Sequence, residues 1–292
     1  MAIPVGFTLQ PDAAFLELCA PLIDDADYYE VTPETLWRVG SDGELAPNGY
    51  HRRFLELAAD SGKPFVAHGV GLSMGTSDRS DAPRRRRWLR RMAADQEAFR
   101  FGWYTEHLGA SSLAGLAMTL PLPVPMDAAA ARVLRGRLSA MQRVVPDVGV
   151  ENNVAYFTLG APLEEPGFLR RVLSAPRTHL LLDLHNLHTM AVNFGFDPDE
   201  YLAGLPLDRV IEIHMSGGSY SDGAWLPSGR VLRLDSHAGA VPEEVFGLLD
   251  RALPRCPNLR GVTLERMEGT VEADDVAGLH DELRRIRARV RR

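Results

Sequence analysis

Eight short apolar segments recur along the chain, and stretches with helical patterning separate most of them. Several of these segments carry apolar residues at consecutive positions, a pattern that is typical of parallel strands buried on both faces. Strands and helices in alternation predict an α/β fold built on a parallel sheet. The predicted strands span residues 4–9, 27–33, 64–72, 99–108, 147–153, 178–186, 209–217 and 260–267.

A closed (β/α)8 barrel, the TIM barrel, is the simplest arrangement for eight such units, and a doubly wound open sheet is the alternative. The chain has 292 residues. A barrel of this type takes roughly 250 residues, so the chain has room for one. No linker is long or polar enough to divide the chain, so we expect a single domain over residues 1–292.

The stretches between the strands have amphipathic spacing and helix-boundary residues. Asp127 stands as an N-cap before an Ala-, Leu- and Arg-rich stretch, and Gly62 ends another helix. The segment 217–237 departs from this rhythm and predicts a loop with a hairpin, inserted after the seventh strand. The predicted helices span residues 11–23, 48–62, 127–145, 165–173, 197–205, 242–253 and 271–292, and a further helix containing the Arg-rich run 84–91 precedes the fourth strand.

Composition disfavours several classes of protein. Lys63 is the only lysine and no GxxxxGK[ST] loop is present, which argues against Schiff-base chemistry and P-loop phosphate binding. The net charge of −7 argues against broad nucleic-acid binding. The two cysteines, Cys19 and Cys256, indicate a reducing compartment, and neither a signal peptide nor an apolar run of membrane-spanning length is visible. We therefore expect a cytoplasmic protein that contacts neither nucleic acid nor membrane.

Acidic, imidazole and amide side chains follow the predicted strands where each strand ends. The carboxyl ends of all strands in a parallel barrel open on one face, so these side chains should meet there. A buried carboxylate or imidazole without a partner costs several kcal/mol, and a metal ion supplies the missing counter-charge. The residues at these ends are His68, Glu106, His107, Glu151, Asn152, Asp183, His185, Asn186, His214 and Glu265, and Asp235 and His237 close the inserted hairpin.

The ligand types narrow the choice of metal. Imidazole favours transition metals over Mg²⁺ and Ca²⁺, and the lack of cysteine ligands argues against structural zinc. Two imidazoles and one carboxylate per metal, with open positions, is the arrangement of non-haem Fe(II) oxygenases. Taken singly, each residue could instead be a hydrogen-bonded core residue or a helix N-cap. The set would suit two or three ions of iron, manganese or zinc, with four imidazoles and four carboxylates: His68, His107, His214, His237, Glu151, Asp183, Asp235 and Glu265.

Other polar residues receive a structural interpretation. Glu30 is a candidate acceptor for the outer nitrogen of a ligand histidine. The Arg-rich run 84–91 is either a solvated helix face or a surface for an acidic partner. We interpret the remaining histidines at helix positions or strand starts as structural or solvated, namely His51, His179 and His280.

Six sequence blocks, at residues 68–75, 104–108, 150–157, 180–218, 234–241 and 262–267, stand in a characteristic order and spacing. They resemble the DUF692 family, the multinuclear non-haem iron-dependent oxidative enzymes (MNIO), in an MbnB-like pattern. The resemblance covers about residues 3–268. It implies a TIM barrel similar to xylose isomerase, holding two or three iron ions and using O2 to oxidise cysteine-containing precursor peptides. It also implies a small partner protein that recognises the leader peptide. The blocks are HGVGLSMG (68–75), YTEHL (104–108), VENNVAYF (150–157), the D-x-x-N to EIH stretch (180–218), LDSHAGAV (234–241) and VTLERM (262–267).

The resemblance also implies a set of metal ligands. Four positions depart from the family pattern: Phe194 and Gly218 stand where the family usually has His, His185 where it mostly has Asn, and His188 where it mostly has an aromatic residue. These departures leave two and three metals both open, and His185 or His188 is a candidate replacement ligand. Carried over by motif, the ligands are His68, His107, Glu151, Asp183, Asn186, His214, Asp235, His237 and Glu265.

These observations predict a non-haem iron oxidase or oxygenase that acts on a cysteine-containing peptide or a related small thiol. In this hypothesis one iron lies between His68, His107 and Glu151, and a second between Asp183, His214 and Glu265. A third lies at Asn186, Asp235 and His237, or these residues line the substrate side. Two alternatives stay open: a zinc- or manganese-dependent isomerase or hydrolase on the same barrel, and a non-catalytic family member, which the departures motivate. An isomerase would want a catalytic lysine near the metals.

Overall fold

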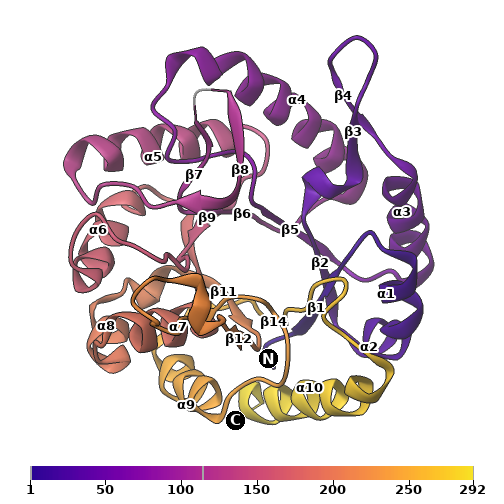
Figure 1. The fold of residues 1–292 in the computed structure, drawn as a ribbon. Helices are drawn as coiled ribbons and strands as arrows, with labels where there is room; N and C mark the ends of the chain where they lie inside the picture. Colours follow the sequence, from indigo (N-terminus) through magenta and orange to yellow (C-terminus); the bar gives the residue numbers. More distant parts are fainter. Residues whose placement is uncertain (1, 114, 292) are drawn as a thin grey trace.

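The computed structural model describes residues 2–113 and 115–291. Eight parallel strands close into a barrel in the order β1-β14-β11-β10-β9-β6-β5-β2 (Figure 1). Each barrel strand lies within one predicted segment, so the TIM-barrel prediction is confirmed and the open sheet is wrong. The barrel strands are β1 Val5–Leu9, β2 Tyr28–Val31, β5 Phe65–Gly69, β6 Tyr104–His107, β9 Val148–Glu151, β10 Thr178–Asp183, β11 Val210–Met215 and β14 Gly261–Leu264.

Helices surround the barrel and bury its outer face (Figure 1). Asp127 caps α5 by accepting the backbone N–H groups of Ala129 and Ala130, and Gly62 ends α3 with a left-handed backbone at φ 65°. Within the described ranges no helix is long and apolar enough to cross a membrane. The surrounding helices are α1 Ala13–Leu18, α2 Ala20–Asp25, α3 Gly49–Ser61, α4 Ala82–Phe99, α5 Ala128–Met141, α6 Glu165–Val172, α7 Leu184–Phe194, α8 Pro198–Gly204, α9 Glu243–Ala252 and α10 Val276–Val290.

The boundary between β10 and α7 differs from the prediction. The sixth strand was expected to continue to residue 186, but it ends at Asp183 and α7 begins at the next residue. The Asp183 carboxylate accepts the backbone N–H of Asn186 at 2.7 Å, so this residue is both the last of the strand and the N-cap of the helix. The apolar run on both sides of Asp183 hides this change in periodicity. His185 and Asn186 therefore stand on the first turn of a helix.

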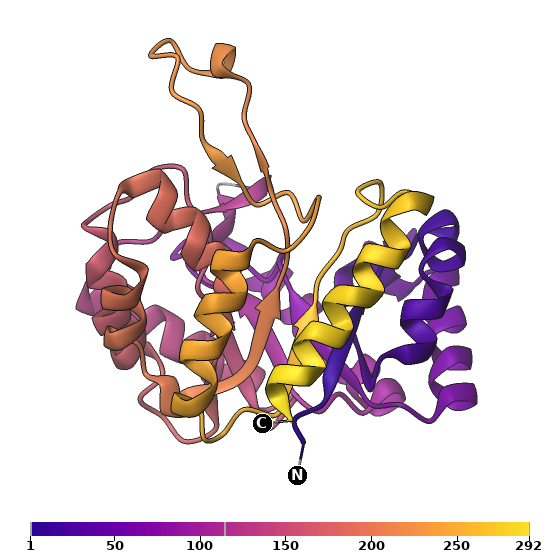
Figure 2. The same ribbon diagram turned by 90° about the horizontal axis from the view of Figure 1, so that it is seen from below.

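Three antiparallel hairpins lie outside the barrel. The pairs β3 (Trp37–Val39) with β4 (Leu45–Pro47) and β7 (Ala110–Leu113) with β8 (Leu116–Leu122) were not predicted. The pair β12 (Ser219–Tyr220) with β13 (Arg233–Leu234) follows β11, and the chain between these two strands contains the 3-10 turn η5 (Gly223–Trp225). Figure 2 shows this segment projecting beyond the barrel, at the end opposite to the marked N-terminus.

The interior of the barrel holds one fully satisfied carboxylate. Glu212 Oε1 accepts hydrogen bonds from Tyr28 Oη at 2.9 Å and from Thr263 Oγ1 at 2.6 Å. Glu212 Oε2 accepts the Trp103 indole N–H at 2.6 Å. Gly261 leaves the space for the Tyr28 ring, because an added Cβ there would overlap the ring. A charged group buried in this way is tolerated because each of its oxygens has a donor.

Candidate metal centre

Glu151 lies between two imidazoles at the carboxyl ends of β5, β6 and β9. Its Oε2 atom is 3.3 Å from His68 Nε2 and 3.2 Å from His107 Nε2. The other ring nitrogens are engaged: His107 Nδ1 donates to the carbonyl of Gly69 at 3.1 Å, and His68 Nδ1 lies 2.9 Å from Thr105 Oγ1. A histidine that donates through Nδ1 presents the lone pair of Nε2, so His107 aims a free lone pair at the space beside Glu151. His68 does the same, because the Thr105 hydroxyl donates to the carbonyl of Ala67 at 3.4 Å and can then accept from His68 Nδ1.

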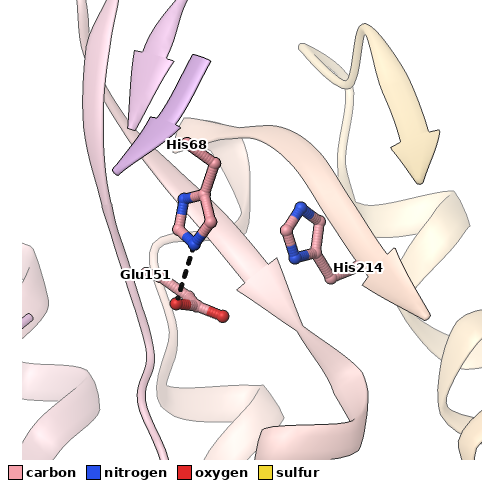
Figure 3. Close-up of side chains that lie close together, drawn as sticks. All are labelled: His68, Glu151 and His214. Atoms are coloured by element: carbon pink, nitrogen blue, oxygen red, sulfur yellow. Dashed lines mark ion pairs between the residues drawn. The ribbon is translucent and has the colours of Figure 1, made fainter. Parts of the chain in front are cut away.

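His214 occupies the end of β11, beside the first group. Figure 3 shows His68, Glu151 and His214 close together. The Nε2 atom of His214 lies 2.8 Å from Glu30 Oε2, so Glu30 is the acceptor that the sequence suggested. The Nδ1 atom lies 3.0 Å from Glu265 Oε2 and 3.9 Å from Asp183 Oδ2. With its proton directed to Glu30, the ring turns a lone pair toward two carboxylates, an arrangement that a cation between them would stabilise.

The inserted segment contributes a third group. Asp235 Oδ1 lies 3.1 Å from His237 Nε2, and His237 Nδ1 lies 3.3 Å from Glu265 Oε1. Glu265 therefore connects this group with the one around His214. On the other side, Asn186 Nδ2 donates to Glu151 Oε1 at 3.0 Å, which leaves Oε2 of that carboxylate free. The structure thus brings all nine predicted ligands to one end of the barrel.

Unsatisfied polar atoms concentrate in this cluster. Eight of the nine predicted ligands, all except His107, have a buried nitrogen or oxygen that makes no hydrogen bond in the structure. Each such atom costs about 1–3 kcal/mol when it lacks a partner, and a native fold rarely keeps many of them. These atoms are His68 Nε2, Glu151 Oε2, Asp183 Oδ2, Asn186 Oδ1, His214 Nδ1, Asp235 Oδ1, His237 Nδ1 and Glu265 Oε2, together with His185 Nδ1 beside them.

The chemistry of these atoms fits metal ions. Two overlapping sets, His68–Glu151–His214 and Glu30–His214–Glu265, each place their ligand atoms within 4.8 Å of one another. The donors are imidazole nitrogens and carboxylate oxygens, which suit iron, manganese or zinc. The mouth of the barrel around His214 can therefore hold a metal ion.

The protonation states of the metal-free site depend on the same contacts. Burial lowers the pKa of His68 to about 3, so this ring is neutral and keeps its lone pair. Burial also opposes a charge on His237, but Glu265 and Asp235 outweigh it and raise the pKa of His237 to about 10. In the metal-free protein, protons on imidazoles thus supply the positive charge that the carboxylates require. A metal that binds here has to displace them.

Several polar residues singled out in the sequence lie outside this cluster. Glu106 bonds with Tyr104, and Asn152 ties β9 to β10 by donating to the carbonyl of Asp183 at 2.8 Å. His51 bonds Asp95, and His179 bonds Asp147. These four residues have structural partners of their own.

Two basic features also have structural roles. Lys63 Nζ donates to the carbonyls of Ile23 and Asp24 at 3.1 and 2.7 Å, just before β5 begins and so away from the mouth of the barrel. Part of the Arg-rich run is not solvated: Arg85 is buried against Asp81, and Arg91 pairs with Asp95. These intramolecular ion pairs explain those arginines without an external partner.

One contact of the cluster was missed in the sequence. Arg233 on β13 reaches His185 Nε2 through its guanidinium at 3.1 Å. An arginine in a loop-rich insert carries no pattern that would reveal such a partner. The contact depends on Gly218, because an added Cβ there would overlap His185 Nε2.

Comparisons with solved structures concern the fold. The xylose isomerase domain protein from Planctomyces limnophilus has a TM-score of 0.61 and 15% sequence identity, with 99% of both chains covered. A D-allulose 3-epimerase from Methylomonas sp. has a TM-score of 0.60 and 15% identity, covering 97% of this chain and 98% of the epimerase. At this identity the likeness shows a xylose isomerase-like TIM barrel and nothing of the reaction.

Sequence comparisons identify the family. A UPF0276 protein from Pseudomonas aeruginosa is 33% identical over 264 residues, which cover 90% of this chain and 85% of that relative. Residues 5–291 match the family described as RiPP precursor modification enzyme MbnB/TglH/ChrH. This match confirms the resemblance drawn from the sequence blocks. The chain therefore belongs to the MbnB/TglH/ChrH family of RiPP precursor modification enzymes.

Proposed function

We propose that this protein is a multinuclear non-haem iron-dependent oxidase or oxygenase that uses O2 to modify a cysteine-containing precursor peptide or a related small thiol. The observation that carries the proposal is the set of buried, unsatisfied donor atoms at the mouth of the barrel. The family membership supports a peptide substrate, because the family is described by RiPP precursor modification.

The proposed ligands fall into three groups. His68, His107 and Glu151 would hold one ion, and Asp183, His214 and Glu265 a second. The remaining ligands, Asn186, Asp235 and His237, would hold a third ion or line the substrate side. Iron bound at these residues would supply the redox chemistry that couples reduction of O2 to oxidation of the substrate.

The chain itself orients each ligand. Glu30 accepts a hydrogen bond from His214 Nε2, and the carbonyl of Gly69 accepts one from His107 Nδ1. These acceptors fix the ring tautomers and raise the basicity of the free nitrogens. Asn186 holds one oxygen of Glu151 and so directs the other toward the imidazoles.

Metal analysis tests the proposal. Protein purified without oxygen should carry two or three equivalents of iron, and O2 consumption should rise when a cysteine-containing peptide is added. Less than one equivalent of bound transition metal would overturn the proposal. The variant His280→Ala, on the outer helix α10, is the matched control and should keep the metal content of the unchanged protein.

No particular contact supports either of the two alternatives, a zinc- or manganese-dependent isomerase or hydrolase and a non-catalytic family member. An isomerase that uses lysine near its metals is disfavoured, because Lys63 bonds the backbone of Ile23 and Asp24. Activity with Zn²⁺ or Mn²⁺ in the absence of O2 would favour an isomerase or hydrolase over the proposal. Lack of any O2 consumption by the iron-loaded protein across candidate peptides would favour a non-catalytic family member.

A further inference from the structure

His185 is the first candidate for a further metal ligand. It stands on the first turn of α7, between Asp183 and Asn186, and its side chain is fully buried. Its Nδ1 atom makes no hydrogen bond in the structure and lies 3.4 Å from Asp235 Oδ1. By position and burial alone, His185 could bind a metal together with Asp235.

The opposite nitrogen of the ring argues against ligation. His185 Nε2 lies 3.1 Å from the Arg233 guanidinium nitrogen Nη2 and 3.4 Å from the Thr189 hydroxyl, which can donate or accept. A guanidinium only donates hydrogen bonds, so Nε2 has to accept and cannot carry a proton. The proton of the neutral ring then resides on Nδ1, and Nδ1 has no lone pair for a metal. His107 and His214 differ, because their outer nitrogens face a carbonyl and a carboxylate, which are acceptors.

Arg233 is held in this position by its surroundings. Its backbone N–H donates to Asn193 Oδ1 at 2.8 Å, and its carbonyl accepts from Asn193 Nδ2 at 2.9 Å. Its guanidinium lies over the Tyr220 ring at 5.4 Å, and the residue is only 5% exposed. Among the described residues Arg233 pairs with no carboxylate, so its contact with His185 is not a by-product of an ion pair.

The ring of His185 is confined on its other side as well. An added Cβ at Gly218 would overlap both the Nε2 and Cε1 atoms of His185 and the carbonyl of Leu234. Gly218 thus provides the space in which Arg233 and His185 meet.

We propose that Arg233 fixes the tautomer of His185 with the proton on Nδ1, the nitrogen that lies 3.4 Å from Asp235 Oδ1, and that His185 therefore does not bind a metal. Arg233 and His185 are then positioning residues for Asp235. Asp235 Oδ1 lies between His185 Nδ1 and His237 Nε2, so the orientation of its carboxylate depends on both rings. The inference rests on the proposed function only in that Asp235 faces a metal.

Nuclear magnetic resonance on ¹⁵N-histidine-labelled protein tests the tautomer. The probes are the metal-free protein and protein loaded with Zn²⁺ or ¹¹³Cd²⁺, and His185→Leu assigns the signals. We expect the ¹⁵N shift of a protonated nitrogen at Nδ1 and of an unprotonated one at Nε2. A proton on Nε2, or a ¹¹³Cd coupling to Nδ1, would overturn the proposal. The Arg233→Met variant should move the signals toward a mixture of tautomers, and an unchanged pattern would count against the role of Arg233.

Metal binding supplies a second measurement. In His185→Leu the number of ions bound at saturating metal should not change, while the affinity of the weakest site falls roughly 10–100-fold, as for other residues that hold a ligand from behind. His185→Asn, which keeps an N–H donor toward Asp235, should restore most of that affinity. The loss of one full equivalent in a folded His185→Leu protein would show that His185 is a ligand. The control is His280→Leu on the outer helix α10, which should bind like the unchanged protein.

The two proposals fail in different ways. A protein that binds no transition metal would refute the proposed function, but the tautomer of His185 would still be measurable in the metal-free protein. A protein that binds iron but has its His185 proton on Nε2 would refute only the further inference.

Discussion

Replacing Glu151 by Gln should make the metal-free protein more stable while it removes a metal. Asn186 Nδ2 donates to Glu151 Oε1, so the oxygen of the new amide stays there and its NH2 group takes the place of Oε2. Oε2 lies 3.3 Å from His68 Nε2 and 3.2 Å from His107 Nε2. The amide can therefore donate to both imidazole lone pairs, which the carboxylate oxygen cannot do.

The size of this effect follows from the unsatisfied atoms. The substitution gives a partner to His68 Nε2 and removes a buried charge, whose pKa in Glu151 is raised by burial. Satisfying one buried polar atom is worth about 1–3 kcal/mol. For a chain of this length each kcal/mol corresponds to a Tm rise of about 2 °C, because the shift per kcal/mol falls as the chain grows longer.

Two measurements test this prediction. Thermal unfolding of chelator-treated protein gives the stability without metal, and elemental analysis of the loaded protein gives the metal content. We expect a higher Tm without metal and the loss of at least one equivalent with metal. Glu164→Gln, at an exposed carboxylate, is the control and should change neither quantity. A variant with a full metal complement, or one that is less stable than the unchanged protein without metal, would refute the reasoning.

Three further predictions use other contacts. Metal affinity should fall as the pH falls, because the pKa of His237 in the metal-free protein is raised to about 10 and protons compete with the metal for the ring. Titration calorimetry in buffers of different ionisation enthalpy should detect the release of protons on metal binding. Binding without proton release would contradict this prediction. Asp147→Asn should lower stability by about 1–3 kcal/mol at pH 7. Burial opposes the charge of Asp147, but hydrogen bonds from two arginines and a histidine hold its pKa well below the usual range, so this contribution is fully present above the unfolded-state pKa and is lost as the pH falls through the lower folded-state pKa. In denaturant unfolding the stability difference between the two proteins should therefore be full at pH 7 and smaller but still present at pH 3, and a difference that grows on acidification would contradict the reasoning. Gly218→Ala should lower the Tm, because the new Cβ would overlap His185. Gly136→Ala, whose new Cβ meets no atom within 4 Å, should instead raise stability by roughly 0.5–1 kcal/mol. Equal effects of the two substitutions would refute the steric argument.

The barrel was predictable because its strands are buried on both faces. Segments such as β10 (Thr178–Asp183) carry apolar residues at consecutive positions, and a polar residue at the end of the strand marks the mouth. Once the strands are parallel and closed, the strand-end residues have to meet. The contact between His68 and Glu151 therefore follows from the predicted positions of the strand ends.

Other features depend on contacts that a sequence pattern does not encode. Asp183 ends a strand and caps a helix at once, so no turn residue separates β10 from α7, and α7 was missed. The hairpins β3–β4 and β7–β8 are short pairs whose residues do not alternate strongly between apolar and polar. The role of His185 depends on whether a donor or an acceptor faces its outer nitrogen, and that neighbour, Arg233, is 48 residues away in the chain.

The distribution of the cluster over the barrel also bears on the biosynthesis of the protein. His68 lies on the third barrel strand, whereas Glu265 follows β14, which pairs with β1 to complete the ring of strands. A nascent chain emerging from the ribosome exposes the early histidines long before the late carboxylates have been translated. The full set of predicted ligands therefore exists only once the last strand has joined the first, so closure of the barrel and assembly of the cluster are one event.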